Sequence, residues 1–171
     1  MRYALLCLGF TLFIFHSDAY ADSTNPRKIT SNNAWDGYTY REDGALVCYM
    51  ISSPTREEGE YTKRGKVFAF VTHRTGEKSY NEGLFQAGYD FKPGSTVNVN
   101  IDGQRYTLVT DDGLAHPKAP REDREMVDAM RKGNKMVVKG TSSRGTLTTD
   151  TYSLKGFTAT HKAINDKCGL E

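Results

Sequence analysis

The sequence predicts a mainly β protein, folded as an antiparallel sandwich or barrel. Short apolar runs with a period of two residues recur between Trp35 and Tyr152, and clusters of turn residues separate them. About seven or eight such strands are expected, which is typical of these folds. The 171 residues of the chain are enough for one domain with a sizeable core.

The expected strands differ in which of their faces are apolar. Residues 46–51 and 67–71 are apolar on both faces, as in strands central to a packed structure. Residues 97–101 instead alternate between apolar and polar positions. The pair Asp102-Gly103 follows and favours a two-residue hairpin, because both turn positions need a positive φ. Further strands are expected at 106–109, 135–139 and 146–153, the last two flanking the turn Ser143-Arg144-Gly145.

Two helices are expected near the C-terminal end. The first spans 120–133, because Pro120 opens it, acidic residues follow, and basic residues and Gly133 end it. The second runs from about residue 157 to 167, where apolar residues and Cys168 recur on one side.

Residues 1–21 carry the pattern of a secretory signal peptide. Arg2 precedes an apolar run that is too short to span a bilayer, and Ala19-Tyr20-Ala21 supplies small residues for cleavage. Leu6 before Cys7 is too large for a lipoprotein signal. We expect export to the periplasm or the cell surface, with no transmembrane span after cleavage. Residues 22–34 are predicted to be a flexible leader or a first extended arm, before a single domain over 35–171.

Cys48 and Cys168 remain after this cleavage and are predicted to form a disulfide. In an oxidising compartment, an even pair of cysteines is more simply a disulfide than a metal site or a reactive thiol. The sequence has no C-x-x-C motif, so thiol–disulfide exchange chemistry has little support.

The charge pattern argues against nucleic-acid binding. The chain has 23 basic and 21 acidic residues, a net charge of +2, with both signs interspersed. Nucleic-acid-binding domains instead carry clustered Lys and Arg. The Asp111-Asp112-Gly113 segment is interpreted as a solvated loop rather than a calcium site. The sequence therefore predicts no metal and no cofactor.

Catalytic residues are not evident either. A hydrolase could use Ser142 or Ser143 with His73, His116 or His161 as its base. Neither serine lies in a nucleophile elbow, and their segment fits a hairpin loop between two strands equally well. The histidines also lack the spacing of metal ligands.

A basic stretch around residues 67–71 is a candidate binding surface for anionic lipid, lipopolysaccharide or an acidic partner. It consists of Lys63, Arg64, Lys66, His73 and Arg74. The alternative is a solvated edge strand, whose charges prevent sheet-to-sheet aggregation. Trp35, Tyr38 and Tyr40 could also form a binding surface, but aromatic residues at alternating strand positions are more often core.

Several sequence blocks follow one another in a recognisable order. They are Cys48-Tyr49, Lys63-Arg64-Gly65, Thr72-His73-Arg74, Ala87-Gly88-Tyr89, Ile101-Asp102-Gly103 and, as the longest block, residues 136–157. With these blocks the chain resembles the invasion-associated locus B family of alphaproteobacterial envelope proteins. The resemblance implies an exported, immunoglobulin-like β-sandwich with one or two short helices. It also implies a link to host-cell entry, after which the family is named, and it brings no catalytic motif.

Two functions remain open from the sequence. The favoured one is an exported, non-enzymatic binding protein with a protein or envelope partner, acting in host-cell interaction or envelope function. The alternative is a small secreted hydrolase or sugar-binding enzyme that uses Ser143 or His116.

Overall fold

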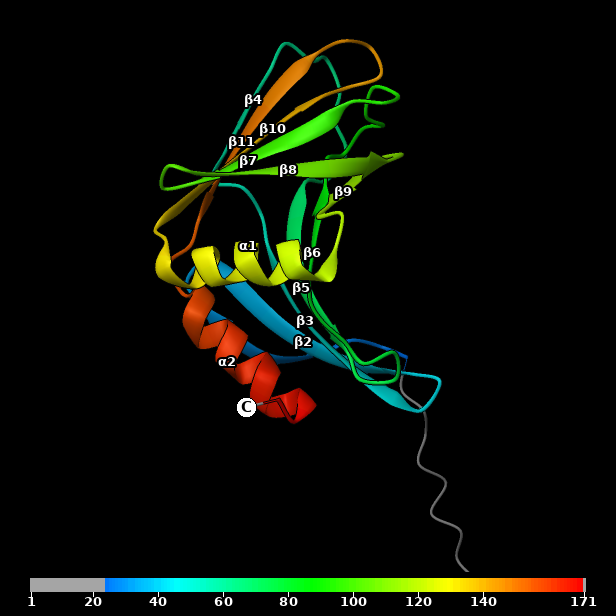
Figure 1. Cartoon of the computed structure of the whole chain (residues 1–171), viewed down its shortest axis with the longest axis vertical. Coiled ribbons are helices and arrows are strands. Elements are labelled where there is room, and N and C mark those ends of the chain that lie inside the picture. The colour runs from blue at the N-terminus through cyan, green and yellow to red at the C-terminus, as the bar shows by residue number, and fades with distance from the viewer. Residues whose placement is uncertain (1–23, 171) are drawn as a thin grey trace, which may run out of the picture.

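The strands form one continuous antiparallel sheet that bends between two halves (Figure 1). The computed structural model describes residues 24–170. Its strands pair in the order β1-β2-β3-β5-β6-β9-β8-β7-β10-β11-β4. The predicted mainly β, antiparallel, sandwich-like fold with two helices is confirmed. The signal peptide predicted at residues 1–21 lies outside the described residues.

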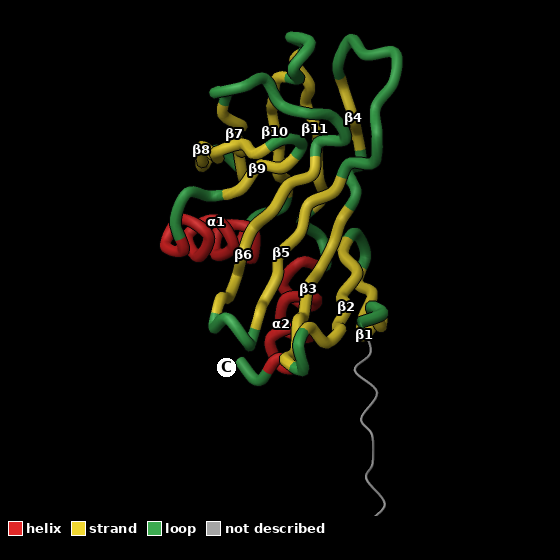
Figure 2. Tube along the Cα trace, turned by 90° about the vertical axis from the view of Figure 1, so that its right-hand side faces the viewer, coloured by secondary structure: helices red, strands yellow, loops and turns green. Residues whose placement is uncertain are grey.

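The first half of the sheet contains the strands that run side by side in Figure 2. They are β1 (Arg27–Asn32), β2 (Trp35–Glu42), β3 (Ala45–Ser52), β5 (Phe68–Arg74) and β6 (Ser79–Gln86). β3 and β5 lie inside this half, each hydrogen-bonded to a strand on both sides. The two runs predicted to be central therefore each lie between two other strands of the sheet.

The second half contains β4 (Arg56–Glu58), β7 (Thr96–Ile101), β8 (Gln104–Asp111), β9 (Leu114–His116), β10 (Lys135–Thr141) and β11 (Leu147–Ser153). The predicted hairpin joins β7 to β8, and both of its turn residues have positive φ, 46° at Asp102 and 102° at Gly103. β9 pairs with β6 and with β8, so it connects the two halves.

The two predicted helices are α1 (Pro120–Lys132) and α2 (Phe157–Cys168). α1 packs on β6 and places Met126, Val127 and Met130 in the core. α2 covers one face of β1, β2 and β3, and Figure 2 shows it behind this half of the sheet. The helices and the bent sheet enclose one cluster of buried apolar residues.

A disulfide joins Cys48 in β3 to Cys168 at the end of α2. The two Cα atoms are 6.1 Å apart, and both residues are buried. The predicted cross-link is therefore present, and it anchors the C-terminal helix to the middle of the first half-sheet.

The structure corrects the expectation of a flexible leader at 22–34. From Arg27 onward this segment is β1, paired with β2, so the alternative of a first extended arm holds there. Asn32 also donates a hydrogen bond from Nδ2 to Thr160 Oγ1 at 3.1 Å, which fastens the arm to α2. The sequence pattern gave no indication of β4, β6 or β9, because β4 and β9 are very short and β6 begins with polar residues.

Candidate binding sites

The outer face of the first half-sheet is rich in apolar side chains that no other element covers among the residues described. We call this surface the aromatic face, and it consists of Tyr38, Tyr40, Val47, Tyr49, Ile51, Phe68, Phe70 and Leu84. Strand alternation puts these side chains opposite the face that packs on α2. Figure 2 looks onto the strands from this open side. Seven of the eight residues are partly exposed, and only Val47, at 2%, is buried.

The rings of the aromatic face contact one another across strands. Tyr38 and Tyr49 stack with their centroids 5.3 Å apart, and Tyr40 meets the ring of Tyr49 edge-on at 6.1 Å. Phe68 and Phe70 form a second edge-on pair at 5.9 Å. Phe68 and Phe70 lie on the same strand, β5, whereas the tyrosine pairs join β2 to β3 and help to hold the rings in place. Trp35 is fully buried, as expected, whereas Tyr38 and Tyr40 lie on this outer face and not in the core.

Ion pairs neutralise the charged residues that border the aromatic face. Arg74 contacts Glu42 at 2.6 Å and Glu82 at 3.3 Å, and Lys28 contacts Asp36 at 2.8 Å. Arg74, the last residue of the predicted basic stretch, is thus paired with carboxylates of the protein itself. A partner on this face would meet apolar rings, bordered by these charged side chains that are already paired with one another.

A second site is a cavity of about 470 Å³ at the far end of the second half-sheet. Three loops line it: the connection from β4 to β5, the connection from β6 to β7, and the hairpin between β10 and β11. We call it the loop cavity, and its side chains include Tyr61, Lys63, Tyr89, Asp90, Ser143 and Arg144.

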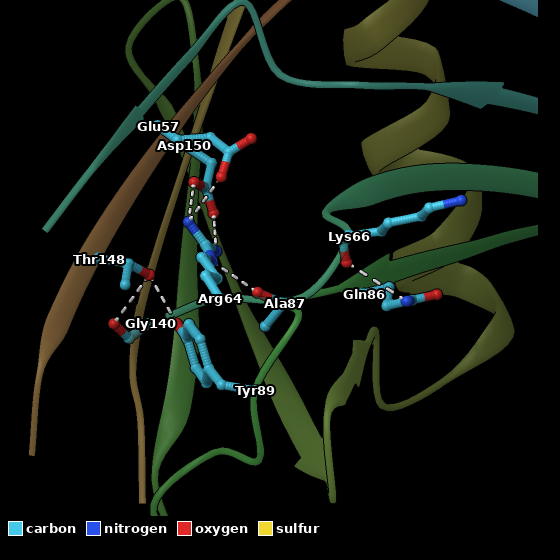
Figure 3. A network of polar contacts seen from close by, with 9 residues as sticks. All are labelled: Glu57, Arg64, Lys66, Gln86, Ala87, Tyr89, Gly140, Thr148 and Asp150. Carbon is cyan, nitrogen blue, oxygen red and sulfur yellow. Dashed lines mark hydrogen bonds and ion pairs between the residues drawn. The ribbon is translucent and has the colours of Figure 1, made fainter. Parts of the chain in front are cut away.

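The buried Arg64 guanidinium lines the loop cavity and holds together the segments around it. It makes a bidentate contact with Asp150, with Nη1 and Nη2 each 2.7 Å from a carboxylate oxygen, and Nε donates to the Ala87 carbonyl at 2.7 Å. Figure 3 shows these contacts together with Glu57, whose carboxylate lies 3.6 Å from Nη1. Burial alone would lower the pKa of Arg64, but its hydrogen bonds and its attraction to Asp150 outweigh burial and raise the pKa. Arg64 therefore stays charged and ties the β4–β5 loop to β11.

Two tyrosine rings also pack against the Arg64 guanidinium. The guanidinium carbon of Arg64 lies 5.5 Å from the ring centroid of Tyr61 and 5.1 Å from that of Tyr89. The Tyr89 hydroxyl is 2.6 Å from Thr148 Oγ1, which donates on to the Gly140 carbonyl (Figure 3). Burial raises the pKa of Tyr89.

Backbone hydrogen bonds join the three loops. The Gly65 N–H donates to the Gly88 carbonyl at 2.8 Å, and the Ser143 N–H donates to the Asp90 carbonyl at 2.7 Å. Gly88 has φ of +73°, and a side chain there would place Cβ 2.5 Å from the Gly65 carbonyl oxygen, so only glycine permits this approach. The cavity is thus preorganised.

The structure divides the predicted basic surface. Arg64, with a side chain only 3% exposed, and His73, at 0%, lie in the interior. Lys63 and Lys66 are exposed on the loop before β5. The alternative of an edge strand is also wrong, since β5 is paired on both sides. The five residues do not form one surface.

The hydrolase candidates are not brought together. Ser142 and Ser143 line the loop cavity, but no histidine does. Ser142 Oγ accepts a hydrogen bond from the Thr146 N–H at 3.1 Å, as expected for a hairpin turn. His116 lies on β9, and its Nδ1 contacts the Pro117 carbonyl at 2.8 Å.

His73 and His161 are interior residues packed against each other. Their ring centroids are 5.6 Å apart, between β5 and α2. Among residues 24–170, no group of His, Cys, Asp and Glu could hold a metal ion. Over the same residues, no helix has the length and apolar character to cross a membrane.

For both sites, the sequence contains a feature that was not used to predict the site. The apolar outer positions of 46–51 and 67–71 predicted two-sided burial, but apart from Val47 the structure leaves the outer side partly exposed. Asp150 stands between Thr148 and Tyr152 on an inward-facing set of strand positions, which marks it as a buried carboxylate that needs a partner. The sequence does not indicate which basic residue pairs with Asp150.

Comparison with known proteins agrees with the geometry. The sequence profile of the "Invasion associated locus B (IalB) protein" family matches residues 35–165. No curated protein matches the chain by sequence. The crystal structure of invasion associated protein B from Bartonella henselae has a similar fold, with a TM-score of 0.57 and 15% identity. The match covers 85% of this chain and 99% of the other. The chain belongs to the invasion associated locus B family.

Proposed function

We propose that this chain is an exported, non-enzymatic binding protein of the bacterial envelope that holds a partner protein on its aromatic face. The observation that carries this proposal is the open apolar side of β2, β3 and β5. Antiparallel sheets commonly present polar residues to water on their solvent side. Here that side carries five aromatic rings.

The composition of the aromatic face fits a protein partner. Aromatic residues are enriched at the cores of protein–protein interfaces, and charged residues are depleted there. Rigid tyrosine rings also lose little conformational entropy on binding. Because the bordering charges are already paired, the face suits an uncharged apolar partner surface better than anionic lipid or lipopolysaccharide.

A non-enzymatic role agrees with the placement of the candidate catalytic residues. Ser143 has no histidine beside it in the loop cavity, and His116 has no serine among its hydrogen-bonding partners in the described structure. The disulfide supports export, because such bonds persist in oxidising compartments. Function in the periplasm or at the cell surface is therefore part of the proposal.

Photo-crosslinking in living cells tests this function. A photoreactive amino acid replaces Tyr49, at the centre of the aromatic face, in the full-length chain. The matched control places it at Thr107, an exposed residue of β8 in the other half-sheet. Export is read from the mass of the mature protein in the periplasmic or surface fraction, which should lack residues 1–21.

We expect a discrete protein adduct from position 49 and none from position 107. Replacing Phe70 by serine in the Tyr49-labelled chain should abolish the adduct without lowering the yield of folded, exported protein. Equal adducts at both positions, or none at either, would refute the proposal. The identity of the captured protein then tells whether the role concerns the envelope itself or contact with a host cell.

A further inference from the structure

We infer that the loop cavity binds a neutral saccharide unit, as a free sugar or as the end of a glycan chain. The cavity and the aromatic face share no residue, so this inference does not depend on the proposed protein partner. Four observations carry it: the size of the cavity, its balance of charges, its exposed aromatic ring and its rigid floor.

The size is suitable for a small polar ligand. Small-molecule sites commonly enclose about 300–1,000 Å³, and the loop cavity encloses about 470 Å³. Its lining is largely hydroxyl, charged and glycine residues, with few aliphatic side chains. An apolar ligand would therefore leave many polar groups without partners.

Two acidic and two basic side chains that line the cavity are free to bind a ligand. Lys63 and Arg144 face the same space as Glu60 and Asp90, and none of the four forms an ion pair within residues 24–170. Because the two carboxylates offset the two cations, the cavity offers a phosphate or another polyanion no net attraction. A sugar hydroxyl can donate to a carboxylate and accept from a cation at the same time, so a neutral polyol uses both signs.

Tyr61 provides a surface on which a sugar ring can stack. Its side chain lines the cavity, the residue is 37% exposed, and the Arg64 guanidinium lies over the ring. The C–H groups of a pyranose carry a small positive charge and pack against the negative face of an aromatic ring.

The floor of the site is fixed before any ligand arrives. Arg64 is locked by Asp150 and Ala87, and backbone hydrogen bonds join the three loops. Such preorganisation reduces the entropy lost on binding, which matters most for weakly binding ligands such as monosaccharides.

Nuclear magnetic resonance titration tests the inference directly. The full chain is expressed with its own leader, and the exported, disulfide-bonded form is purified. Glucose, galactose, N-acetylglucosamine and chitobiose are titrated separately, with inorganic phosphate as a further arm. With at least one sugar we expect saturable shifts concentrated on the amides of Gly65, Gly88 and Ser143.

Variants connect the shifts to the proposed contacts. Tyr61→Ala should weaken sugar binding by up to about tenfold, the affinity equivalent of losing an aromatic contact. Arg144→Gln should weaken it too, whereas Arg105→Gln, at an exposed arginine of β8, should not. Well-dispersed spectra of each variant show that it is folded.

The inference is overturned if no sugar shifts the loop amides, or if the shifts scatter over the surface. Unchanged affinity in Tyr61→Ala, or saturable binding of phosphate in place of sugar, would overturn it equally. A negative result here leaves the crosslink expected from position 49 untouched, so the two proposals fail separately.

Discussion

Mild acid should destabilise this protein through two buried histidines. His161 on α2 is 4% exposed and donates from Nε2 to Asn81 Oδ1 at 2.7 Å. His73 on β5 is fully buried, accepts the Asn81 N–H on Nδ1 at 3.0 Å and contacts Asn165 Oδ1 through Nε2 at 2.8 Å. Because Nδ1 of His73 accepts a hydrogen bond, that ring is neutral.

Burial, followed by repulsion from His73 when that ring is protonated as well, lowers the pKa of His161 from 6.5 to about 4. Burial also lowers the pKa of His73. Among nearby charged groups, Arg131 lowers the pKa of His161 further, Asp128 opposes this, and Glu82 raises that of His73. None of these outweighs burial.

The sign and the size of the effect follow from proton linkage. Between pH 6.5 and pH 4 the unfolded chain binds more protons than the native protein, so stability is full above this window and falls as the pH falls through it. For His161 alone the complete loss is about 3 kcal/mol, of which about 2 kcal/mol falls between pH 7 and pH 5.

Urea unfolding of the mature protein at pH 7, 6 and 5 measures this loss. The matched variant is His161→Gln, because a glutamine amide can still donate to Asn81 but does not titrate. The wild type should lose about 2 kcal/mol more than the variant between pH 7 and pH 5. Equal losses in the two proteins would show that His161 does not titrate with a lowered pKa.

Three further predictions concern the cross-links and turns of the fold. Reduction, or Cys48→Ser, should lower stability by up to about 5 kcal/mol, the chain-entropy value for a bridge between residues 120 apart in sequence; thermal melts should show that reductant has no effect on the variant. Arg64→Met leaves the buried carboxylate of Asp150 without its cation and should cost about 3–5 kcal/mol in urea unfolding. Adding Asp150→Leu should recover most of that loss, and no recovery would contradict a buried ion pair. Gly156→Ala should be far more damaging in thermal melts than Gly145→Ala; both glycines have positive φ, but only the Cβ at Gly156 would overlap the backbone of β1. Similar losses from the two alanine variants would count against the close contact.

Much of the fold was readable from the chain, because its signals are local. Alternating side chains indicated the strands, paired turn residues such as Asp102-Gly103 placed a hairpin, and Pro120 with Gly133 bounded a helix. The cysteine count predicted the disulfide. β1 was less certain from the sequence, because Ile29 is its one apolar residue and the strand is held mainly by β2 and α2.

The sites required the tertiary structure. The basic stretch looked like one surface because its residues are near in sequence, yet strand alternation and the core turn His73 inward, and Arg64 is drawn to Asp150, 86 residues away. The loop cavity likewise depends on three loops that meet only when the sheet bends. The sequence by itself determined the fold class and the cross-link, since each depends on neighbouring residues or on a simple count, and it also predicts an export signal. Which apolar face stays open and which charges are buried were decided only by folding, because both depend on partners distant in sequence.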